Sequence, residues 1–596
     1  MNSETKKCQN CQKDFVIEPE DFVFYEKIKV PAPTFCWECR TMRRFSWRNE
    51  RTFYRNSCAI TGKSLISGFS PKSGITVYDR DIWWSDKWDS MEYGRDYDFN
   101  KPFFVQFYEL MRRVPQPAVF NARTVNADYT QHTGDLKNGY LVSASWGGED
   151  IYYSSRVHES KDCWDVFAVS NCELCHQDIM VNKSYRILFS QDSDNCSDSY
   201  FLFECRNCQN CFGCTNLRNK LYYIFNEPHT KEEYLKKIRE FDLGSFNKLE
   251  ELRKQFSELK IKALRKYANI NNAQLVTGDN IKNTNNCQRC FDVSKDIRDC
   301  KFIQNALQIK DSYDGYGIGA SAELLYEVFD SGVQGSKLCF GAIIYGGTNV
   351  YYSYNCHSSS NLFGCVGLRN KQYCIFNKQY TKESFDKLRT KIIEHMNSMP
   401  YVDKKGRTYK YGEFFPPELS PFSYNETIAQ EYFPLTKEQV IKQGYSWKDP
   451  DERNIKIQIP NNKLSDHIKD VEDSMVGKTI ECSHQGKCNE QCTFGFKIIS
   501  KELEFYKKMN LSLPRLCPNC RHYQRIKQRN PLKLWHRKCM CAGEVSDQQP
   551  TTNYQYQNTI EHFHKTDHCP NEFQTTYAPD RPEIVYCEKC YQQEVV

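Results

Sequence analysis

The chain has 596 residues, with 81 Lys and Arg against 75 Asp and Glu, and therefore a formal net charge of +6. This length predicts several domains rather than a single core. The small net charge gives no reason to expect a polyanionic partner along the whole chain, and the absence of any run of about 18 apolar residues excludes a membrane-spanning helix.

The first residues, MNSETKKCQNCQKDF, lack the apolar centre of a signal peptide. We therefore expect a soluble, cytoplasmic protein with no membrane partner. The thirty cysteines would stay reduced in that compartment, so we expect them to be metal ligands or small core residues instead of disulfides.

Two CxxC pairs near the start of the chain, Cys8 with Cys11 and Cys36 with Cys39, indicate a zinc site. Together they supply four thiolates for a tetrahedral ion. The alternating apolar residues of DFVIEPEDFVFY predict a hairpin between the pairs, and the second pair is expected to open a helix. We assign residues 1–60 to this first zinc ribbon.

A helix that starts near Cys36 places Arg40, Arg44 and Arg48 on one face, at i, i+4 and i+8. Like charges in this arrangement repel one another, so an anionic partner should offset them. Phosphate, gripped bidentately, is one such partner. Salt bridges to Glu38, Glu50 and other carboxylates, on a solvated or inter-domain face, are the alternative, and the sequence does not separate the two.

Residues 61–135 form a Trp- and Asp-rich segment that contains Trp83, Trp84 and Trp88. Its aspartates are Asp79, Asp81, Asp86, Asp89, Asp96 and Asp98. Carboxylates beside aromatic side chains are typical of sites that cleave sugars. A cap that packs Trp on the first coil of the next domain is the alternative, and it is favoured because the repeat described below has no copy of this segment.

The centre of the chain predicts a tandem duplicated β-solenoid, mainly β, with coils of about 22 to 24 residues. Short alternations broken by Asn, Asp, Ser or Gly fill residues 136–228, and FGCTNLRNKLYYIFN (212–226) returns 151 positions later as FGCVGLRNKQYCIFN (363–377). The second unit covers 279–379. Capping helices are expected in a helical insert at 229–278 and again at 380–400, because open sheet edges need covers.

The decapeptide CRNCQNCFGC (205–214) has the cysteine spacing of an iron–sulfur site. In the second copy, however, Ser359 and Leu362 replace Cys208 and Cys211. A four-thiolate cluster would not survive these losses, so we interpret the central cysteines as small packing residues.

After a connector at 401–475, residues 476–540 repeat the N-terminal ribbon at a shift of 481. The repeat pairs Cys11, Cys36 and Cys39 with Cys492, Cys517 and Cys520, and Cys8 with Cys488 after a slip of one residue. Both copies, over residues 8–58 and 488–539, resemble short bacterial domains known as probable zinc ribbons of treble-clef type. The resemblance implies a fold and a metal but no activity.

The second ribbon is basic, with 14 Lys and Arg against 4 Asp and Glu over residues 478–540. Its candidate nucleic-acid contacts are Arg521, Arg525, Lys527, Arg529 and Arg537. A third zinc ribbon is expected at 541–596 with the ligands Cys569, Cys587, Cys590 and, as the fourth, His564; His562, His568 and Cys541 are alternatives for that position.

These features predict a non-catalytic scaffold with two or three zinc ions that binds structured RNA or a ribonucleoprotein through its Arg-bearing zinc helices. A protein–protein adaptor, with the solenoid face as docking surface and structural zinc, is the second hypothesis. A carbohydrate-active enzyme that uses the Asp/Trp segment is the third.

Overall fold

The computed structural model describes residues 2–449, 455–542, 556, 558–565 and 567–596. The chain is mainly β and divides into two compact units. The first unit contains Met1–Asn121, Ala268–Asp449 and Leu532–Leu534; the second contains Ala122–Tyr267, Pro450–Pro531 and Trp535–Val596. Among the described residues, no helix has the length and apolar character needed to span a bilayer.

The first unit combines the N-terminal part of the chain with a central part, residues 268–449. Its N-terminal part contains β1 (Glu4–Lys7), β2 (Asp14–Ile17), α1 (Pro19–Ile28), α2 (Trp37–Phe45), β3 (Tyr54–Ser57), β4 (Ser64–Ser67), β5 (Val77–Tyr78), α3 (Arg80–Trp84), α4 (Phe103–Arg113) and β6 (Gln116–Pro117). Its central part contains β21 (Ile270–Gly332), β22 (Ser336–Tyr351), β23 (Tyr354–Phe363), β24 (Gln372–Ile375), β25 (Lys378–Gln379), α7 (Lys382–Ser398), β26 (Tyr401–Val402), β27 (Thr408–Tyr409), α8 (Ile428–Tyr432) and α9 (Lys437–Lys442). Strand β7 (Asn121–Ala122) lies where the chain leaves this unit.

The second unit joins a central run of strands to the C-terminal third. The strands are β8 (Thr130–Gln131), β9 (Thr133–Tyr140), β10 (Val142–Ser143), β11 (Trp146–Tyr152), β12 (Ser155–Trp164), β13 (Phe167–Ser170), β14 (Glu173–His176), β15 (Tyr185–Leu188), β16 (Ser197–Phe203), β17 (Gln209–Thr215), β18 (Leu221–Ile224) and β19 (Glu227–Pro228). The remaining elements are α5 (Lys231–Glu240), α6 (Phe246–Lys262), β20 (Leu264–Lys266), β28 (Ile480–Glu481), β29 (Gly495–Phe496), α10 (Ser500–Met509), α11 (Pro518–Ile526), β30 (Trp535–Lys538), β31 (Glu572–Thr575), β32 (Ile584–Tyr586) and α12 (Glu588–Val595).

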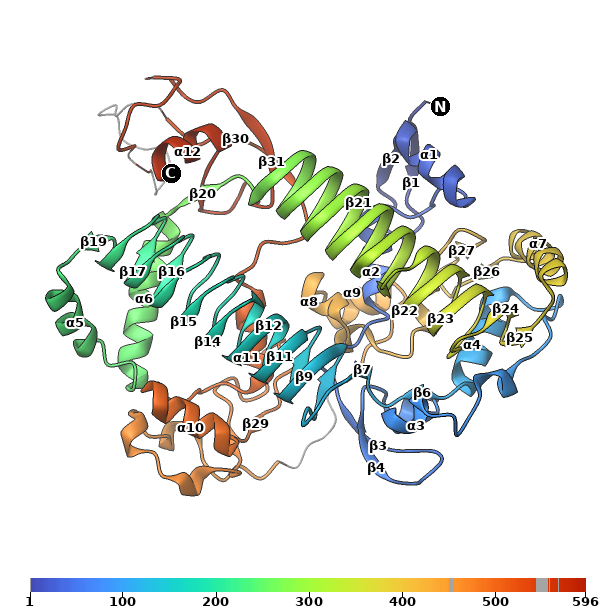
Figure 1. Cartoon of the computed structure of the whole chain (residues 1–596), viewed down its shortest axis with the longest axis horizontal. Helices are drawn as coiled ribbons and strands as arrows, with labels where there is room; N and C mark the ends of the chain where they lie inside the picture. The colour runs from blue at the N-terminus through green and yellow to red at the C-terminus, as the bar shows by residue number, and fades with distance from the viewer. Residues whose placement is uncertain (1, 450–454, 543–555, 557, 566) are drawn as a thin grey trace. The chain divides into compact units, whose positions relative to one another are not determined.

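Each unit contains a stack of parallel strands through which the chain winds in successive turns (Figure 1). In the first stack, residues 133–224, parallel partners lie 12 residues apart, as in the series Ile151, Cys163 and Cys175. In the second stack, residues 270–375, the spacing is 13 where β21 pairs with β22 and 12 in the following turns. Each of the 22- to 24-residue lines expected from the sequence therefore spans about two turns.

The backbone explains this shorter repeat. Every third residue from Arg123 to Phe225 has a positive φ, with Gly147 and Gly213 at two of these positions. Asn and Asp tolerate this conformation better than most side chains and recur there, for example at Asn207 and Asn210. A turn of 12 residues thus bends four times. Turns of 13 residues carry two consecutive positive-φ residues at one bend, as at Val333 and Gln334, so the extra residue leaves the other positions in register.

The interior of the first stack is filled by one residue in three. The buried cluster Leu136, Val142, Ile151, Val157, Cys163, Val166, Val169, Cys172, Cys175, Val181, Ile187, Cys196, Leu202, Cys205, Cys208, Cys211 and Cys214 follows that spacing. Serine and cysteine suit these narrow positions because their polar atoms bond the backbone. The Ser199 hydroxyl accepts a hydrogen bond from the Cys211 amide at 2.9 Å, and the Cys205 thiol donates to the carbonyl of Phe203 at 3.5 Å.

The four cysteines of CRNCQNCFGC are therefore the four inward positions of one turn. Each thiol donates to the carbonyl two residues earlier, at 3.3 to 3.5 Å. Among the described residues, no group able to hold a metal ion includes a cysteine of either stack. Small packing residues account for this segment without a cluster.

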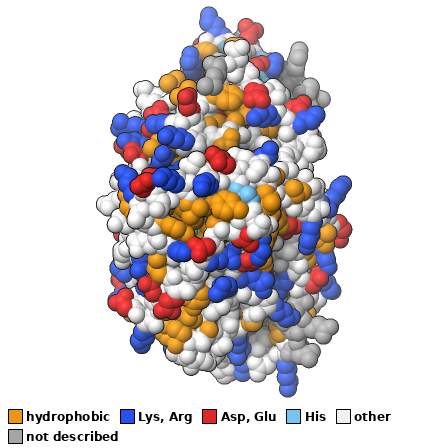
Figure 2. Space-filling view, turned by 90° about the vertical axis from the view of Figure 1, so that its right-hand side faces the viewer, with side chains coloured by type: hydrophobic (Ala, Val, Ile, Leu, Met, Phe, Trp, Pro, Cys, Tyr) orange, Lys and Arg blue, Asp and Glu red, His pale blue; other side chains and the backbone are white. Residues whose placement is uncertain are grey.

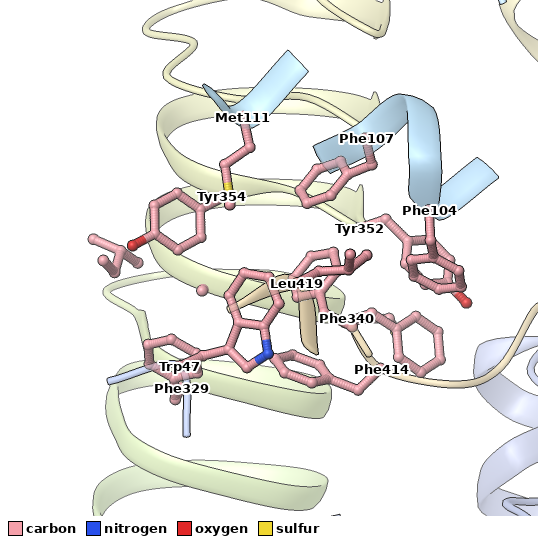
Figure 3. Packing of buried hydrophobic residues seen from close by; sticks show 14 of the residues in the cluster. Trp47, Phe104, Phe107, Met111, Phe329, Phe340, Tyr352, Tyr354, Phe414 and Leu419 are labelled. Carbon is pink, nitrogen blue, oxygen red and sulfur yellow. The ribbon is translucent and has the colours of Figure 1, made fainter. Parts of the chain in front are cut away.

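An aromatic core links the second stack to the rest of the first unit (Figure 3). Trp47 lies between Phe329 and Phe414, while Phe107 of α4 stacks on Phe415 with ring centroids 4.7 Å apart. Phe414 and Phe415 are fully buried. Residues 401–449, expected to be a weakly structured connector, are thus part of the core, because their aromatic side chains cover the outward-facing rings of the stack.

The last turn of each stack is followed by a short antiparallel strand and a helix. Strand β18 pairs with β19, and β24 pairs with β25. Helices α5 and α7 then begin after Thr230 and Thr381, whose hydroxyls accept a hydrogen bond from the amide three residues later at 3.2 Å in both cases. These helices lie where the sequence predicted caps.

Candidate metal centres

The N-terminal cysteines converge as the sequence predicted. The ligand atoms of Cys8, Cys11, Cys36 and Cys39 all lie within 4.8 Å of one another. Cys8 follows β1, Cys11 precedes β2, and Cys36 is the N-cap of α2, so Cys39 lies in the first turn of that helix. Hydrogen bonds with the Cys36 and Cys39 thiols lower the pKa of Cys8 far below its usual range.

The second site differs from the prediction in one ligand. Cys482, Cys492, Cys517 and Cys520 form the four-cysteine group, so Cys482 occupies the place assigned to Cys488. Cys482 follows β28 as Cys8 follows β1. Nine residues lie between Cys482 and Cys492, however, whereas only two lie between Cys8 and Cys11. The Cys488 sulfur lies 3.7 Å from the Cys520 sulfur, in a neighbouring group with His484 and Glu490. Because the loop between the first two ligands is longer in this copy, the alignment at a shift of 481 paired Cys8 with Cys488 instead of Cys482.

The third site contains Cys539, Cys569, Cys587 and Cys590, all buried. Cys539 provides the fourth ligand that was expected from His564. It follows β30 directly, and residues 543–555, 557 and 566, which come between it and Cys569 in the sequence, lie outside the described part of the chain. His564 belongs to a second group beside this one, with Cys541, His562 and Cys590.

Sulfur distances in all three groups fit a shared ion. Sulfurs in a tetrahedral zinc site with bonds of about 2.3 Å lie roughly 3.8 Å apart. The observed Sγ–Sγ distances are 3.7 Å for Cys11 and Cys36, 3.9 Å for Cys482 and Cys520, and 3.8 Å for Cys569 and Cys587. All of these cysteines are free thiols.

The three sites share one local plan, which we call the hairpin–helix module. Two antiparallel strands flank the first two ligands, and the third ligand is the N-cap of a helix whose first turn carries the fourth. The N-cap cysteines Cys36, Cys517 and Cys587 have φ of −65°, −65° and −63°. This repetition explains why the second CxxC pair was easier to predict than the first.

A fourth module without a full ligand set lies at residues 54–84. Strands β3 and β4 form its hairpin, and Cys58 follows β3. The Cys58 sulfur accepts a hydrogen bond from the Asp79 amide at 3.3 Å, as the Cys539 sulfur does from the Cys587 amide at 3.1 Å. Asp79 is the N-cap of α3. Thr61, Asp79 and Ile82 therefore stand where the other modules have their remaining cysteines.

The environment of Cys58 matches this interpretation. Burial raises the pKa of the Cys58 thiol, but hydrogen bonds with Thr61 and with the Asp79 amide lower it by more. The pKa therefore lies below its usual value. Residues 54–60 were assigned to the first zinc ribbon and residues 61–84 to the capping segment. The module was not predicted, because only one of its four cysteines remains.

The arginines of the first module are buried and paired with carboxylates of the second stack. Both nitrogens Nε and NH2 of Arg40 donate to Asp314 Oδ2, at 3.0 and 2.8 Å. Arg44 donates to Asp314 at 3.2 Å and to Glu327 at 2.9 Å. Arg48 donates to Glu50 at 2.6 Å and lies 3.3 Å from Asp330. None of the three is more than 3% exposed.

This burial changes the interpretation of Arg40, Arg44 and Arg48. A guanidinium that is enclosed and already bonded to carboxylates is not available to phosphate, so the salt-bridge alternative fits these residues. Burial lowers the pKa of Arg40, but Asp314, Tyr25 and Tyr326 together raise it well above the usual value, which keeps the guanidinium charged. Arg43, which was not among the predicted residues, joins the network through Glu327 at 2.7 Å and Glu413 at 2.9 Å.

The second unit repeats the contact with different residues. Arg521 donates to Asp165 at 2.7 Å and to Glu502 at 3.1 Å, and Arg525 donates to Asp165 at 2.8 Å. Asp165 is fully buried, and although burial raises its pKa, the charges of Arg521 and Arg525 lower it below the usual value. Asp165 and Asp314 are equivalent, since each lies two turns before the repeated residues Phe189 and Phe340.

The other predicted nucleic-acid residues occupy varied positions. Arg529 is partly buried, with its guanidinium 5.5 Å from the centre of the Phe167 ring. Lys527 is exposed and forms a salt bridge with Glu490. Arg537 is partly buried and donates to the Ala578 carbonyl at 3.3 Å. These three side chains do not form one surface with Arg521 and Arg525, which are buried.

The Asp/Trp segment is organised by packing and capping. Trp83 is fully buried, with its indole nitrogen donating to the Pro115 carbonyl at 2.9 Å, and Trp88 donates to the Trp83 carbonyl at 2.8 Å. Asp79 accepts from the Asp81 amide at 3.0 Å, and Asp89 accepts from the Met91 amide at 2.9 Å. Trp83 and Trp88 lie against the Arg369 guanidinium of the second stack, at 5.4 and 5.6 Å, and not on the first coil of the first stack, where the cap was expected. Trp84, Asp86, Trp88 and Asp89 also line a pocket of about 340 Å³, and the sugar-cleavage hypothesis stays a prediction.

Comparisons with known proteins give no family. No family model matches the chain, and no curated protein matches it. Among solved structures, a putative acetyltransferase from Desulfovibrio desulfuricans G20 aligns with 48% of this chain and 76% of its own, with 10% identity and a TM-score of 0.10. A likeness this low carries no argument about fold or activity.

Proposed function

We propose that this protein is a non-catalytic scaffold in which structural zinc sites hold hairpin–helix modules against two β-solenoids, and that it acts as a protein–protein adaptor. The observation that carries the proposal is the buried contact between the modules and the stacks. Arg40 and Arg44 meet Asp314, and Arg521 and Arg525 meet Asp165.

Zinc is the ion that this donor set suits best. Four thiolates in a tetrahedron are typical of structural zinc and leave no coordination position for a substrate. The sites would therefore stabilise the modules, which are too small to rely on their own cores. Three four-cysteine groups in the described part of the chain could each hold one such ion.

The position of the ligands connects the ion to the docking contact. In both units the N-cap cysteine precedes the first buried arginine by four residues, Cys36 before Arg40 and Cys517 before Arg521. An ion that fixes the first helical turn thus fixes the next turn, which carries the guanidinium. Loss of the ion would free the first helical turn and separate the buried arginines from their carboxylate partners. Buried charges without partners destabilise the fold.

The outer face of the first stack supports a protein partner over a polyanion. Lys137, Glu149, Lys161, Glu173 and Tyr185 stand side by side on successive turns. On the molecular face drawn in Figure 2, Lys and Arg are likewise interspersed with Asp and Glu. A surface of alternating sign suits a partner that carries both charges.

Metal removal tests the structural role. Treatment with a strong chelator should lower the melting temperature of the intact chain and speed its proteolysis, and added Zn²⁺ but not Mg²⁺ should restore both. Unchanged melting after loss of all bound metal, verified by elemental analysis, would refute the structural role.

A second candidate function is binding of a phosphate-bearing ligand such as RNA in the second unit. A cavity of about 430 Å³ there is lined by Arg253, Lys260, Arg515, Arg521 and Arg525, with Glu250 as its acidic residue. Nη1 of Arg515 has no hydrogen-bond partner among the described residues, whereas Nε of Arg253 lies 3.2 Å from Glu250 Oε1. An unsatisfied donor beside an excess of cationic side chains favours an anion.

Fluorescence anisotropy with labelled single-stranded RNA tests this candidate. If it is right, binding should weaken with salt and fall at least tenfold in R253E/K260E, while K137E/K161E on the outer face should bind as the wild type does. RNA binding that is absent, or equal in both variants, would dismiss the cavity as an RNA site.

A further inference from the structure

A second group of metal-ligand side chains lies beside the third four-cysteine site. It contains Cys541, His562, His564 and Cys590, whose ligand atoms are all within 4.8 Å of one another. The Cys541 sulfur is 3.1 Å from His562 Nδ1, and the Cys590 sulfur is 3.4 Å from His564 Nε2. A zinc ion bound tetrahedrally by sulfur and nitrogen holds these atoms roughly 3.5 Å apart. Cysteine and histidine in equal number form a common structural zinc set.

Both histidines are oriented by bonds to the nitrogen that faces away from the group. His562 Nε2 lies 3.0 Å from Glu594 Oε2, and the side chains of both residues are fully buried. His564 Nδ1 lies 2.6 Å from the Asp567 carbonyl. Metal-bound histidines typically donate from their second nitrogen to a carboxylate or a carbonyl, which fixes the tautomer that binds the ion.

Glu594 is itself held in place for this contact. It accepts hydrogen bonds from the Thr559 amide at 2.8 Å, from the Thr559 hydroxyl at 2.7 Å and from the Tyr556 hydroxyl at 3.0 Å. Glu594 and Cys590 both belong to α12 and are four residues apart, so they share one face of that helix. The helix therefore supplies one ligand and the residue that orients another.

Cys590 belongs to both groups, and this sharing decides how many ions the module can hold. Cys539, Cys569 and Cys587 complete a tetrahedron with Cys590 without any histidine, and Cys541, His562 and His564 complete another. Eight ligand positions are thus filled by seven residues. A thiolate has enough lone pairs to bind two ions at once.

We propose that the two groups form a two-zinc centre in which the Cys590 thiolate bridges the two ions. The first ion takes Cys539, Cys569 and Cys587 as its other ligands, and the second takes Cys541, His562 and His564. The inference extends the proposed structural zinc sites and rests on them only for the first of these two ions. Cys541, His562 and His564, which the sequence offered as alternatives for one position, then act together, whereas the fourth alternative, His568, takes no part.

Native mass spectrometry of the intact, zinc-saturated chain tests the proposal by counting ions. The double variant C541S/H562N should lose one ion relative to the wild type, C539S/C569S should lose one, and the combination of all four changes should lose two. H568N, which alters an exposed histidine of the same segment, should lose none. Comparison with the wild type removes the contribution of the other modules.

The outcomes separate the two levels of the proposal. If the four changes together lose only one ion, the module holds a single ion and the two-zinc centre is wrong. An unchanged count in C541S/H562N has the same meaning, whereas an unchanged count in C539S/C569S would contradict the four-cysteine site itself. Loss of two ions from C541S/H562N, through collapse of the module, would still show that two were present.

Cobalt provides a second measurement that does not depend on counting. Two Co²⁺ ions joined by a thiolate couple magnetically, so the cobalt-substituted wild type should give less paramagnetic resonance signal per ion than C541S/H562N does. Equal signal per ion in the two proteins would overturn the bridge.

Discussion

Single carboxylates decide how the arginines of this protein are used. Asp165 and Asp314 are both fully buried, and both lie at positive-φ positions of their stacks, at 54° and 56°. Each accepts hydrogen bonds from two arginines one helical turn apart. The i and i+4 spacing predicted the common face of the arginines, but their partners are remote in sequence, with 274 residues between Arg40 and Asp314.

Removal of one of these carboxylates should be costly. D165N leaves two buried guanidinium groups beside a neutral amide, and we expect the second unit to lose about 3 to 5 kcal/mol of unfolding free energy. The measurement is chemical denaturation, with the loss of structure monitored by hydrogen exchange of the backbone amides in β11–β14. D135N is a matched control, because it breaks the exposed pair with Arg123 at 2.7 Å and should cost less than about 1 kcal/mol. Equal losses in both variants would contradict this account.

Asp178 occupies an inward position of the first stack that other turns fill with Val or Ser. It is fully buried, and its Oδ1 accepts a hydrogen bond from the Ser190 amide at 2.8 Å. Burial raises its pKa well above the usual value. The folded chain therefore holds a proton that the unfolded chain releases above about pH 3.9.

The sign of the pH effect follows from this difference. Because the folded state binds the extra proton, Asp178 stabilises the fold at acidic pH and loses that contribution as the pH rises through the raised value. D178S should accordingly raise the melting temperature more at pH 7 than at pH 4. E173Q, on the exposed face of the same stack, should show no such difference. A gain that is independent of pH would contradict the buried proton.

At the scale of elements, the hairpin–helix module occurs four times in the described part of the chain, and its two halves differ in how well the sequence reveals them. The second CxxC pair opens a helix in each copy that has four cysteines, so its spacing is fixed by helical geometry. The first two ligands are joined by a loop, which tolerates insertion. Cys482 and Cys539 could not be predicted for this reason, whereas Cys36, Cys39, Cys517 and Cys520 could.

The cysteine-poor copy at residues 54–84 offers a direct test of the shared plan. T61C/D79C/I82C should give the chain one additional zinc ion, because the three new thiolates would join Cys58 in the geometry of the other modules. Native mass spectrometry would count it. T61C alone supplies two ligands and should gain none; a triple variant that also gains none would show that the likeness is limited to the backbone.

The stacks illustrate a second limit of the sequence. Small residues at one position in three, with Asn at two of the bends, are visible in CRNCQNCFGC. The interpretation of the cysteines as packing residues came instead from Ser359 and Leu362, which replace Cys208 and Cys211 in the second copy. The length of one turn was not visible, because Tyr153, Arg156, Phe189 and Phe201 occupy positive-φ positions where Asn or Gly would mark a bend. Aromatic residues at these positions face the modules and helices instead.

In the whole molecule, the duplicated parts combine in a nested order. The N-terminal modules belong with the second stack, and the C-terminal modules belong with the first. The sequence showed both duplications, but it gave no indication of which stack each ribbon contacts. The pairing depends on the carboxylates that accept hydrogen bonds from each set of arginines. No local sequence pattern distinguishes these carboxylates from the others.

The exchange predicts where damage to one module will spread. C36S/C39S should remove one metal ion and increase hydrogen exchange in β22 and β23 of the second stack, while β11–β17 of the first stack stay protected. C517S/C520S should give the reverse pattern. Increased exchange in the stack that follows the damaged module along the chain would argue against the nested order.

The short strands β19 and β25 have a consequence for the evolution of chain length. Each pairs antiparallel with the last turn of its stack, and Pro228 in β19 has no amide hydrogen to offer a further strand. An end closed in this way blocks polymerisation of one copy onto another, whatever the number of turns before it. Natural variants of this protein should therefore gain or lose sequence here in whole multiples of a dozen or thirteen residues, with the terminal hairpin left intact.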